Sequence, residues 1–176
     1  GTQALSFSDD GRWLVAANSG AGLAAGAAVD PVASVTTIDV SSYSQTPGAS
    51  DLSGIVSTLA HFNTLTSIDG LPARTSTDIW PQSYSLGQIL EPSAIQVDPD
   101  SHTVWINCQI NNTLVQLDLD SVGTSNAVVG AWGWGVRDME ETGGINATAN
   151  GNPGLDAGIN LFGWRQPDGM SVFSLD

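Results

Sequence analysis

Acidic side chains are the residues of this chain with the most obvious chemistry, because their oxygen atoms suit calcium, a cation that takes about six to eight oxygen ligands. The sequence holds 18 Asp and Glu residues against four Arg and no Lys, which gives a formal net charge of −14. No stretch has the ligand spacing of an EF-hand loop, so a solvated acidic loop is the alternative to a metal site. The candidate calcium ligands stand in loops or at the entrances of expected strands; they are Glu91, Asp168, Asp156, Asp138 and Glu140.

Side chains suited to catalysis are few. His61 and His102 are the two imidazoles of the chain, and they do not form a metal-binding His motif. The sequence also lacks a Gly-x-Ser-x-Gly nucleophile elbow and a phosphate-binding lysine loop. We therefore assign no catalytic residue and no certain cofactor. One alternative is a phosphoesterase-like enzyme that uses a metal bound near Glu91 and Asp168.

Two Asn-x-Thr sequons make the chain a candidate glycoprotein. Asn111 stands in the expected turn between two strands and Asn146 stands in a Gly-rich loop, so we expect a glycosyltransferase to reach both. Cys108 is the single cysteine, which excludes an internal disulfide. It follows an apolar run and is expected to be a small core residue, with pairing to a cysteine outside these 176 residues as the alternative.

The charge balance excludes nucleic acid as a partner, because phosphate backbones are bound through patches of Lys and Arg. No run approaches the roughly 18 consecutive apolar residues of a membrane span, so we do not expect direct membrane insertion. Charged residues make up only 12% of the chain, and 34 Ser and Thr residues supply much of its polarity. Such a surface suits a chain that is glycosylated or packed against a partner.

An internal repeat organises the expected strands. Residues 5–17 align with residues 95–107, and each copy has a strand, a tight turn at Asp10-Gly11 or Asp100-Ser101, and a second strand. Residues of these types tolerate the positive φ that hairpin turns require. Third strands are expected at 34–40 and 113–119, and fourth strands near 54–62 and 126–132.

Short runs rich in Val, Ile, Thr and Trp, separated by Asp, Gly, Pro and Ser, predict an all-β protein with long loops. Two four-stranded antiparallel units indicate two blades of a β-propeller, with a free-standing β-sandwich as the alternative. We assign no helix to the connecting segment. The expected division of the single domain, 1–176, is a blade at 1–62, a connecting segment at 63–89, a blade at 90–135, a loop at 136–165 and the first strand of a third blade at 166–176.

Two blades cannot close a propeller ring, because each blade must be packed between two neighbours. We therefore expect the remainder of the same propeller, or sister subunits, to complete the fold. The chain starts at Gly1 without an initiator Met or a leader-like segment, and we expect it to be an internal piece of a longer precursor.

Several motifs of the chain, taken in their order, resemble the choice-of-anchor I family over nearly all 176 residues. This family includes mesenchyme-specific cell surface glycoproteins and bacterial and algal relatives. The resemblance implies a secreted or surface-anchored, glycosylated propeller of the seven-bladed type, associated with extracellular matrix and in some members with calcium mineral. The motifs are residues 8–18, Asp30-Pro31, 34–40, Leu90-Glu91-Pro92, 109–112, Gly154-Leu155-Asp156 and Gln166-Pro167-Asp168.

The chain departs from the family pattern at acidic positions. Ser19, Ser93 and Ile110 stand where the resemblance implies Glu, and the Asp-rich loop after Asp156 is short. The loss of these carboxylates argues against an enzyme and against a high-affinity metal site. We therefore expect a non-catalytic extracellular or cell-surface glycoprotein that acts in matrix or surface assembly, with matrix or cell-surface components as partners. A calcium-binding matrix or mineral regulator and the phosphoesterase-like enzyme remain as alternatives.

Overall fold

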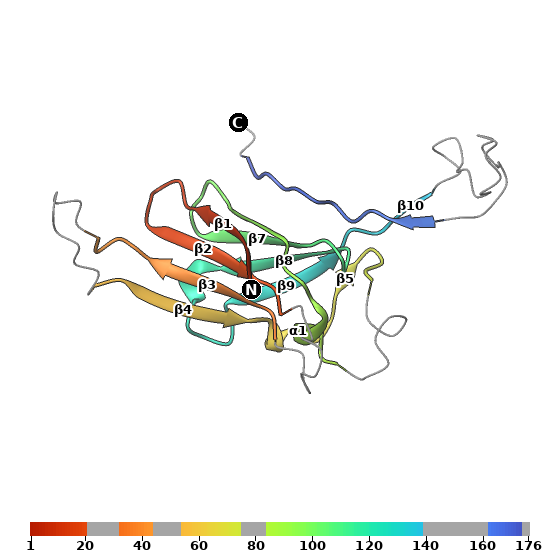
Figure 1. Ribbon diagram of the computed structural model, residues 1–176, viewed down its shortest axis with the longest axis horizontal. Helices are drawn as coiled ribbons and strands as arrows, with labels where there is room; N and C mark the ends of the chain where they lie inside the picture. The colour runs from red at the N-terminus through yellow and green to blue at the C-terminus, as the bar shows by residue number, and fades with distance from the viewer. Residues whose placement is uncertain (21–31, 44–53, 75–83, 139–161, 174–176) are drawn as a thin grey trace.

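The computed structural model of the chain describes residues 1–20, 32–43, 54–74, 84–138 and 162–173. Over these residues the protein is mostly β, with a four-stranded sheet, a five-stranded mixed sheet and a two-stranded ribbon (Figure 1). We call the four-stranded sheet β1-β2-β3-β4 sheet A, and the five-stranded sheet β5-β9-β8-β7-β6 sheet B. No helix in the described part of the chain is long and apolar enough to cross a membrane.

Sheet A is the antiparallel sheet expected from the first repeat. Its first hairpin turns at Gly11, whose φ of 71° lies in the left-handed region that glycine enters without steric cost. The hydroxyl of Ser8 closes this turn by accepting a hydrogen bond from Trp13 N at 2.8 Å. The strands are β1 (Thr2–Phe7), β2 (Trp13–Asn18), β3 (Ser34–Asp39) and β4 (Val56–His61).

Sheet B repeats this arrangement and adds one strand. Four antiparallel strands correspond to the second repeat, and a two-residue strand from the connecting segment pairs parallel to the last of them. The second hairpin turns at Ser101 with a φ of 60°, so both acidic turns contain a residue at positive φ, as the sequence predicts. The strands are β5 (Asp69–Gly70), β6 (Ala94–Val97), β7 (Thr103–Cys108), β8 (Thr113–Asp118) and β9 (Val128–Gly133).

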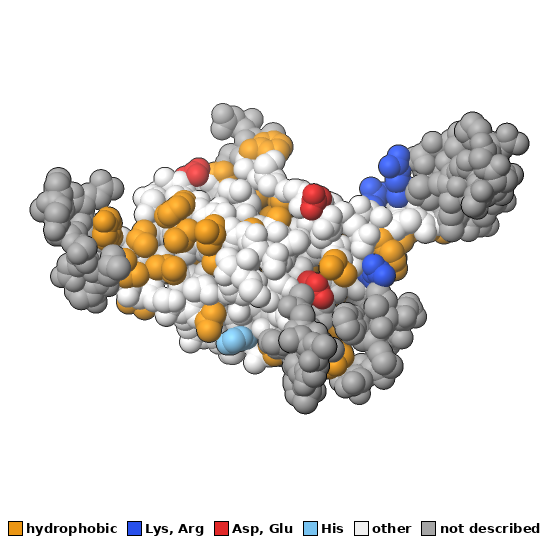
Figure 2. All heavy atoms as spheres, viewed as in Figure 1, with side chains coloured by type: hydrophobic (Ala, Val, Ile, Leu, Met, Phe, Trp, Pro, Cys, Tyr) orange, Lys and Arg blue, Asp and Glu red, His pale blue; other side chains and the backbone are white. Residues whose placement is uncertain are grey.

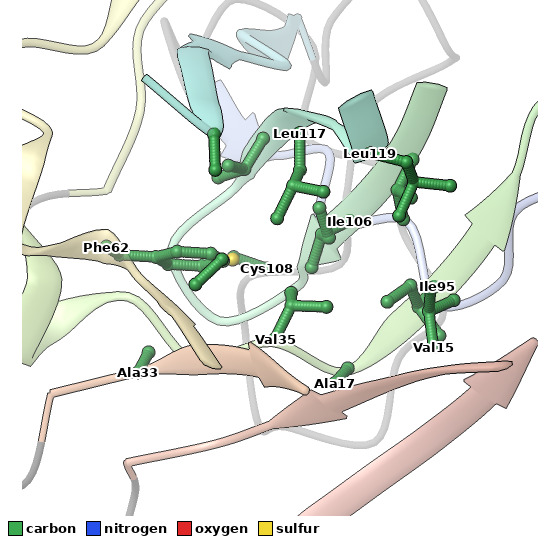
Figure 3. Packing of buried hydrophobic residues seen from close by; sticks show 14 of the residues in the cluster. Val15, Ala17, Ala33, Val35, Phe62, Ile95, Ile106, Cys108, Leu117 and Leu119 are labelled. Carbon is green, nitrogen blue, oxygen red and sulfur yellow. The ribbon is translucent and has the colours of Figure 1, made fainter. Parts of the chain in front are cut away.

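The two sheets pack face to face around one hydrophobic core. Figure 3 shows Ala17 and Val35 of sheet A directed toward Ile106 and Leu117 of sheet B. All four side chains are fully excluded from solvent. β1 lies against β6, so the first strands of the two repeats are neighbours. Alternation of side chains along each strand leaves the opposite face of each sheet turned away from this core.

The segments between the sheets carry more regular structure than expected. The connecting segment 63–89 ends in a one-turn helix, and residues 136–138 and 162–164 form an antiparallel ribbon within the expected loop. The helix has a local signal that the prediction did not use, a capping box in which Ser85 N donates to Gln88 Oε1 at 3.0 Å. It is also packed closely, since a Cβ at Gly87 would lie 2.8 Å from the Phe62 backbone. The elements are η1 (Phe62–Thr64), α1 (Leu86–Ile89), η3 (Leu119–Ser121), β10 (Val136–Asp138) and β11 (Phe162–Trp164).

Residues 166–173, expected to begin a third blade, form no hydrogen-bonded strand. They follow β11 and lie against the face of sheet B that points away from sheet A, where Asn107 Nδ2 donates a hydrogen bond to Pro167 O. Residues 174–176 lie outside the described part of the chain. The division of the chain into blades stays a prediction.

Candidate functional site

The structure places the candidate calcium ligands that it describes on different segments. Glu91 precedes β6, Asp138 ends β10 and Asp168 lies in the segment that crosses sheet B. Within the described residues, no three His, Cys, Asp or Glu side chains come close enough together to hold a metal ion. The two remaining candidates, Asp156 and Glu140, lie outside the described residues, so the complete set stays a prediction.

The acids of the hairpin turns bind their own backbone. Asp10 Oδ1 accepts hydrogen bonds from Ser8 Oγ at 2.6 Å and from Arg12 N at 3.0 Å. Asp100 Oδ1 accepts from His102 N at 2.8 Å and from Thr103 N at 3.1 Å. These bonds favour the charged carboxylates and lower the pKa of Asp10, mainly through Ser8, and the pKa of Asp100, mainly through the His102 amide. The carboxylate oxygens stabilise the turns, which is the usual role of Asp in tight turns.

Asn111, a predicted glycosylation site, is buried. Only 5% of this residue is exposed, and its Nδ2 donates a hydrogen bond to Ile89 O at 2.7 Å while its Oδ1 accepts one from Glu91 N at 2.8 Å. The amide nitrogen that would carry a glycan therefore holds the segment before β6 in place. The folded geometry disfavours Asn111 as an acceptor, and Asn146 lies outside the described residues.

The neighbouring Asn112 has a similar structural role that the sequence analysis missed. It is fully buried, and its Nδ2 donates to Pro72 O at 3.0 Å and to Gly135 O at 2.6 Å. Its Oδ1 accepts from Gln166 N at 2.9 Å. The residue has a φ of 55°, a conformation that Asn adopts more readily than most residues. The Asn-Asn pair directly after a buried strand was the available signal for such a turn.

Cys108 is a core residue, as its position in the sequence predicts. Its side chain is fully buried, and burial raises the pKa of the thiol, with the charge of Glu91 adding to the rise. A buried thiol of this kind stays protonated and unreactive at neutral pH. The full sequence contains a single cysteine, Cys108, and it forms no disulfide in the folded chain.

Tryptophans gather on the face of sheet B that points away from sheet A. The rings of Trp105 and Trp132 lie 6.3 Å apart with an interplanar angle of 54°. Trp105 Nε1 donates to Asp98 Oδ2 at 3.2 Å and Trp134 Nε1 donates to Asn107 Oδ1 at 3.0 Å. A pocket of about 360 Å³ lies between this face and residues 170–173. The indole N–H groups of Trp105 and Trp134 are thus bonded within the fold, which suits packing better than sugar binding.

An exposed apolar surface of the described chain lies on sheet A. Figure 2 shows hydrophobic side chains gathered over β1 to β3. Leu5 is 64% exposed, Phe7 62% and Leu59 52%. The strand register places three further apolar residues on the same face. We call this set the outer face of sheet A; it comprises Leu5, Phe7, Leu14, Ala16, Ile38 and Leu59.

Comparison with known proteins identifies the family but no individual relative. No curated protein and no solved structure matches the chain significantly. The model of the choice-of-anchor I domain, in contrast, matches residues 2–176, nearly the whole length. The chain therefore belongs to the choice-of-anchor I family.

Proposed function

We propose that this chain is a non-catalytic segment of an extracellular β-propeller glycoprotein, which acts in matrix or surface assembly through the surfaces of its blades. The observation that carries the proposal is the way the two repeats are packed. β1 lies against β6, and Ser6 Oγ accepts a hydrogen bond from Val97 N at 3.3 Å, so equivalent strands of successive sheets are neighbours. Consecutive blades of a propeller are arranged in this manner.

A second observation supports a structural role. Two of the polar side chains buried in the described chain, Asn111 and Asn112, bind backbone groups of other segments. Cys108 is held as a neutral thiol in the core. Buried polar groups whose hydrogen bonds are satisfied rigidify the fold around them. The family membership and the hydroxyl-rich composition support an extracellular setting.

The experiment is secretion of the chain from a eukaryotic host, followed by intact mass measurement and hydrolysis assays. We expect a mass above the 18.2 kDa of the sequence, which an N-glycosidase lowers. We also expect no hydrolysis of p-nitrophenyl phosphate with added calcium, magnesium, manganese or zinc. An unglycosylated secreted chain would refute the glycoprotein proposal, and metal-dependent hydrolysis lost in Glu91→Gln would establish the phosphoesterase alternative instead.

The calcium alternative has its own test. A ligand that binds only the folded chain raises the melting temperature by mass action. Melting with calcium and with a chelator therefore distinguishes a calcium-binding regulator, which melts higher with calcium, from a scaffold whose melting temperature does not change.

A further inference from the structure

The outer face of sheet A is equivalent by the internal repeat to a face of sheet B that is buried. The repeat shifts residue numbers by 90, so Leu5 corresponds to Ile95 and Phe7 corresponds to Val97. The exposed fractions are 64% and 62% on sheet A but 6% and 3% on sheet B. The same kind of apolar surface is thus covered in one repeat and open in the other.

The second strand of each repeat shows the same correspondence of positions with a smaller difference in exposure, because Leu14 is half-buried and Ala16 is only 7% exposed. Leu14 and Ala16 on the outer face correspond to Val104 and Ile106, which are fully buried. What buries them is the inner face of sheet A, including the small side chain of Ala17 (Figure 3). The intramolecular interface therefore defines which kind of surface covers this face: a sheet whose facing side chains are apolar, with Val15, Ala17 and Val35 in the core cluster beside Trp13.

A backbone N–H group of β1 provides a second indication of the same kind of interface. In sheet B, Val97 N donates a hydrogen bond to the hydroxyl of Ser6 on the neighbouring sheet. The equivalent donor in sheet A is Phe7 N. Ser8 N donates to Trp13 O across the hairpin, and successive N–H groups of a strand point in opposite directions. The N–H of Phe7 therefore points away from β2, toward the edge of sheet A. A neighbouring strand with a hydroxyl at the position of Ser6 would satisfy it.

We propose that the outer face of sheet A is the docking surface for another four-stranded antiparallel sheet of this same repeat, packed as sheet A packs on sheet B. The proposal rests on the proposed function and names the partner of its blade surface. A second copy of the chain does not supply such a sheet. The inner face of its sheet A is buried against its own sheet B, and residues 166–173 lie against the opposite face of sheet B.

The test is an extended chain in which a duplicate of residues 1–90 is joined directly before Gly1, which preserves the 90-residue spacing of the repeat. Leu5→Cys in the original sheet A reports on the outer face, because the duplicate adds no cysteine and Cys108 is fully buried. Val129→Cys, on β9 of sheet B and 54% exposed, is the matched control. The readout is the rate of maleimide labelling.

We expect the duplicate to slow labelling of Leu5→Cys by about tenfold or more, because a packed side chain reacts only when its surroundings open. The control rate should not change. Equal labelling of Leu5→Cys in the original and extended chains would overturn the proposal, as would a duplicate that adds no β-sheet signal in circular dichroism.

Labelling of the original chain at low and high protein concentration tests the other occupant. Protection of Leu5→Cys that rises with concentration would mean that a second copy covers the face, and it too would overturn the proposal. These outcomes are independent of glycosylation and hydrolysis, so failure of the docking surface is distinguishable from failure of the proposed function.

Discussion

The backbone N–H of Asp10 donates a hydrogen bond to Ser101 Oγ at 3.3 Å, so the turn of the first hairpin is bonded to the turn of the second. These turns occupy equivalent places in the two repeats. Ser101 is buried and has a φ of 60°, while its equivalent, Gly11, has a φ of 71° and no hydroxyl. The sequence difference between the two turns therefore gives the second repeat a contact to the first.

Ser101→Ala tests this contact. Both side chains carry a Cβ at positive φ, so the change removes the hydroxyl without altering the backbone strain, and we expect a loss of about 1 kcal/mol in the free energy of unfolding. Ser101→Gly is the matched variant: it also lacks the hydroxyl but relieves the strained φ, so it should lie close to the original chain. Urea denaturation measures both; equal stability of Ser101→Ala and the original chain would contradict the assignment.

Asn112 should be the most sensitive polar residue of the described chain. Asn112→Ala leaves the buried Gly135 O and the half-buried Gln166 N without this partner and removes one of the two hydrogen bonds to Pro72 O, so we expect a loss of about 3 kcal/mol. Asn126→Ala, at an exposed turn position, is the control and should cost under about 1 kcal/mol.

Denaturant titration of the two Asn variants provides the comparison. A loss at Asn112 no larger than the loss at Asn126 would show that the three hydrogen bonds contribute little. Asn112→Gly separates the two contributions, because glycine keeps the positive φ but makes none of the side-chain bonds.

Local sequence patterns predict the repeated strands well because each repeat contains its own signals. The hairpin turns at Gly11 and Ser101 follow from residue types within a few positions. β5 does not, because its pairing with β9 depends on the close approach of Leu71 to a glycine more than 60 positions away. The burial of Asn111 has a similar cause, since its partner Ile89 lies 22 positions earlier in the chain. Tertiary contacts of this kind leave no periodic pattern.

Gly133→Ala tests the contact that holds β5. A Cβ on Gly133 would lie 1.8 Å from Leu71 O, so the added methyl group must push the connecting segment off the edge of sheet B. We expect a loss of about 1–3 kcal/mol in the free energy of unfolding and faster hydrogen exchange in β5. Gly169→Ala is the control, because nothing lies within 4 Å of its Cβ position. Unchanged exchange in β5 would contradict the predicted displacement.

Acid should destabilise the chain through its turn carboxylates. Hydrogen bonds lower the pKa of Asp10, mainly from Ser8, of Asp39, mainly from Ser41, and of Asp100, mainly from the His102 amide. A carboxylate whose pKa is lower in the folded chain contributes stability above the unfolded pKa, near 3.8, and loses it as the pH falls through the folded pKa. The melting temperature should therefore fall below this pH.

The variant Asp100→Asn gives the pH prediction its control. Its amide oxygen can accept the same backbone hydrogen bonds but does not titrate, so the melting temperature of the variant should depend less steeply on pH in the acid range. Melting curves between neutral pH and strong acid provide the measurement. An identical acid dependence in the two chains would show that Asp100 does not contribute to it.

The two sequons should behave differently in the secreted protein. Asn111 uses its amide nitrogen to bind Ile89 O, so a glycan there would break a buried hydrogen bond and displace the segment that precedes β6. We expect Asn146→Gln to lower the intact mass by one N-glycan. Asn111→Gln should leave the mass of the folded protein unchanged and lower its melting temperature, because the longer side chain does not fit the same pair of bonds at Ile89 and Glu91. The opposite mass pattern would mean that glycosylation occurs before the turn closes and that the secreted chain folds with Asn111 outside its buried position.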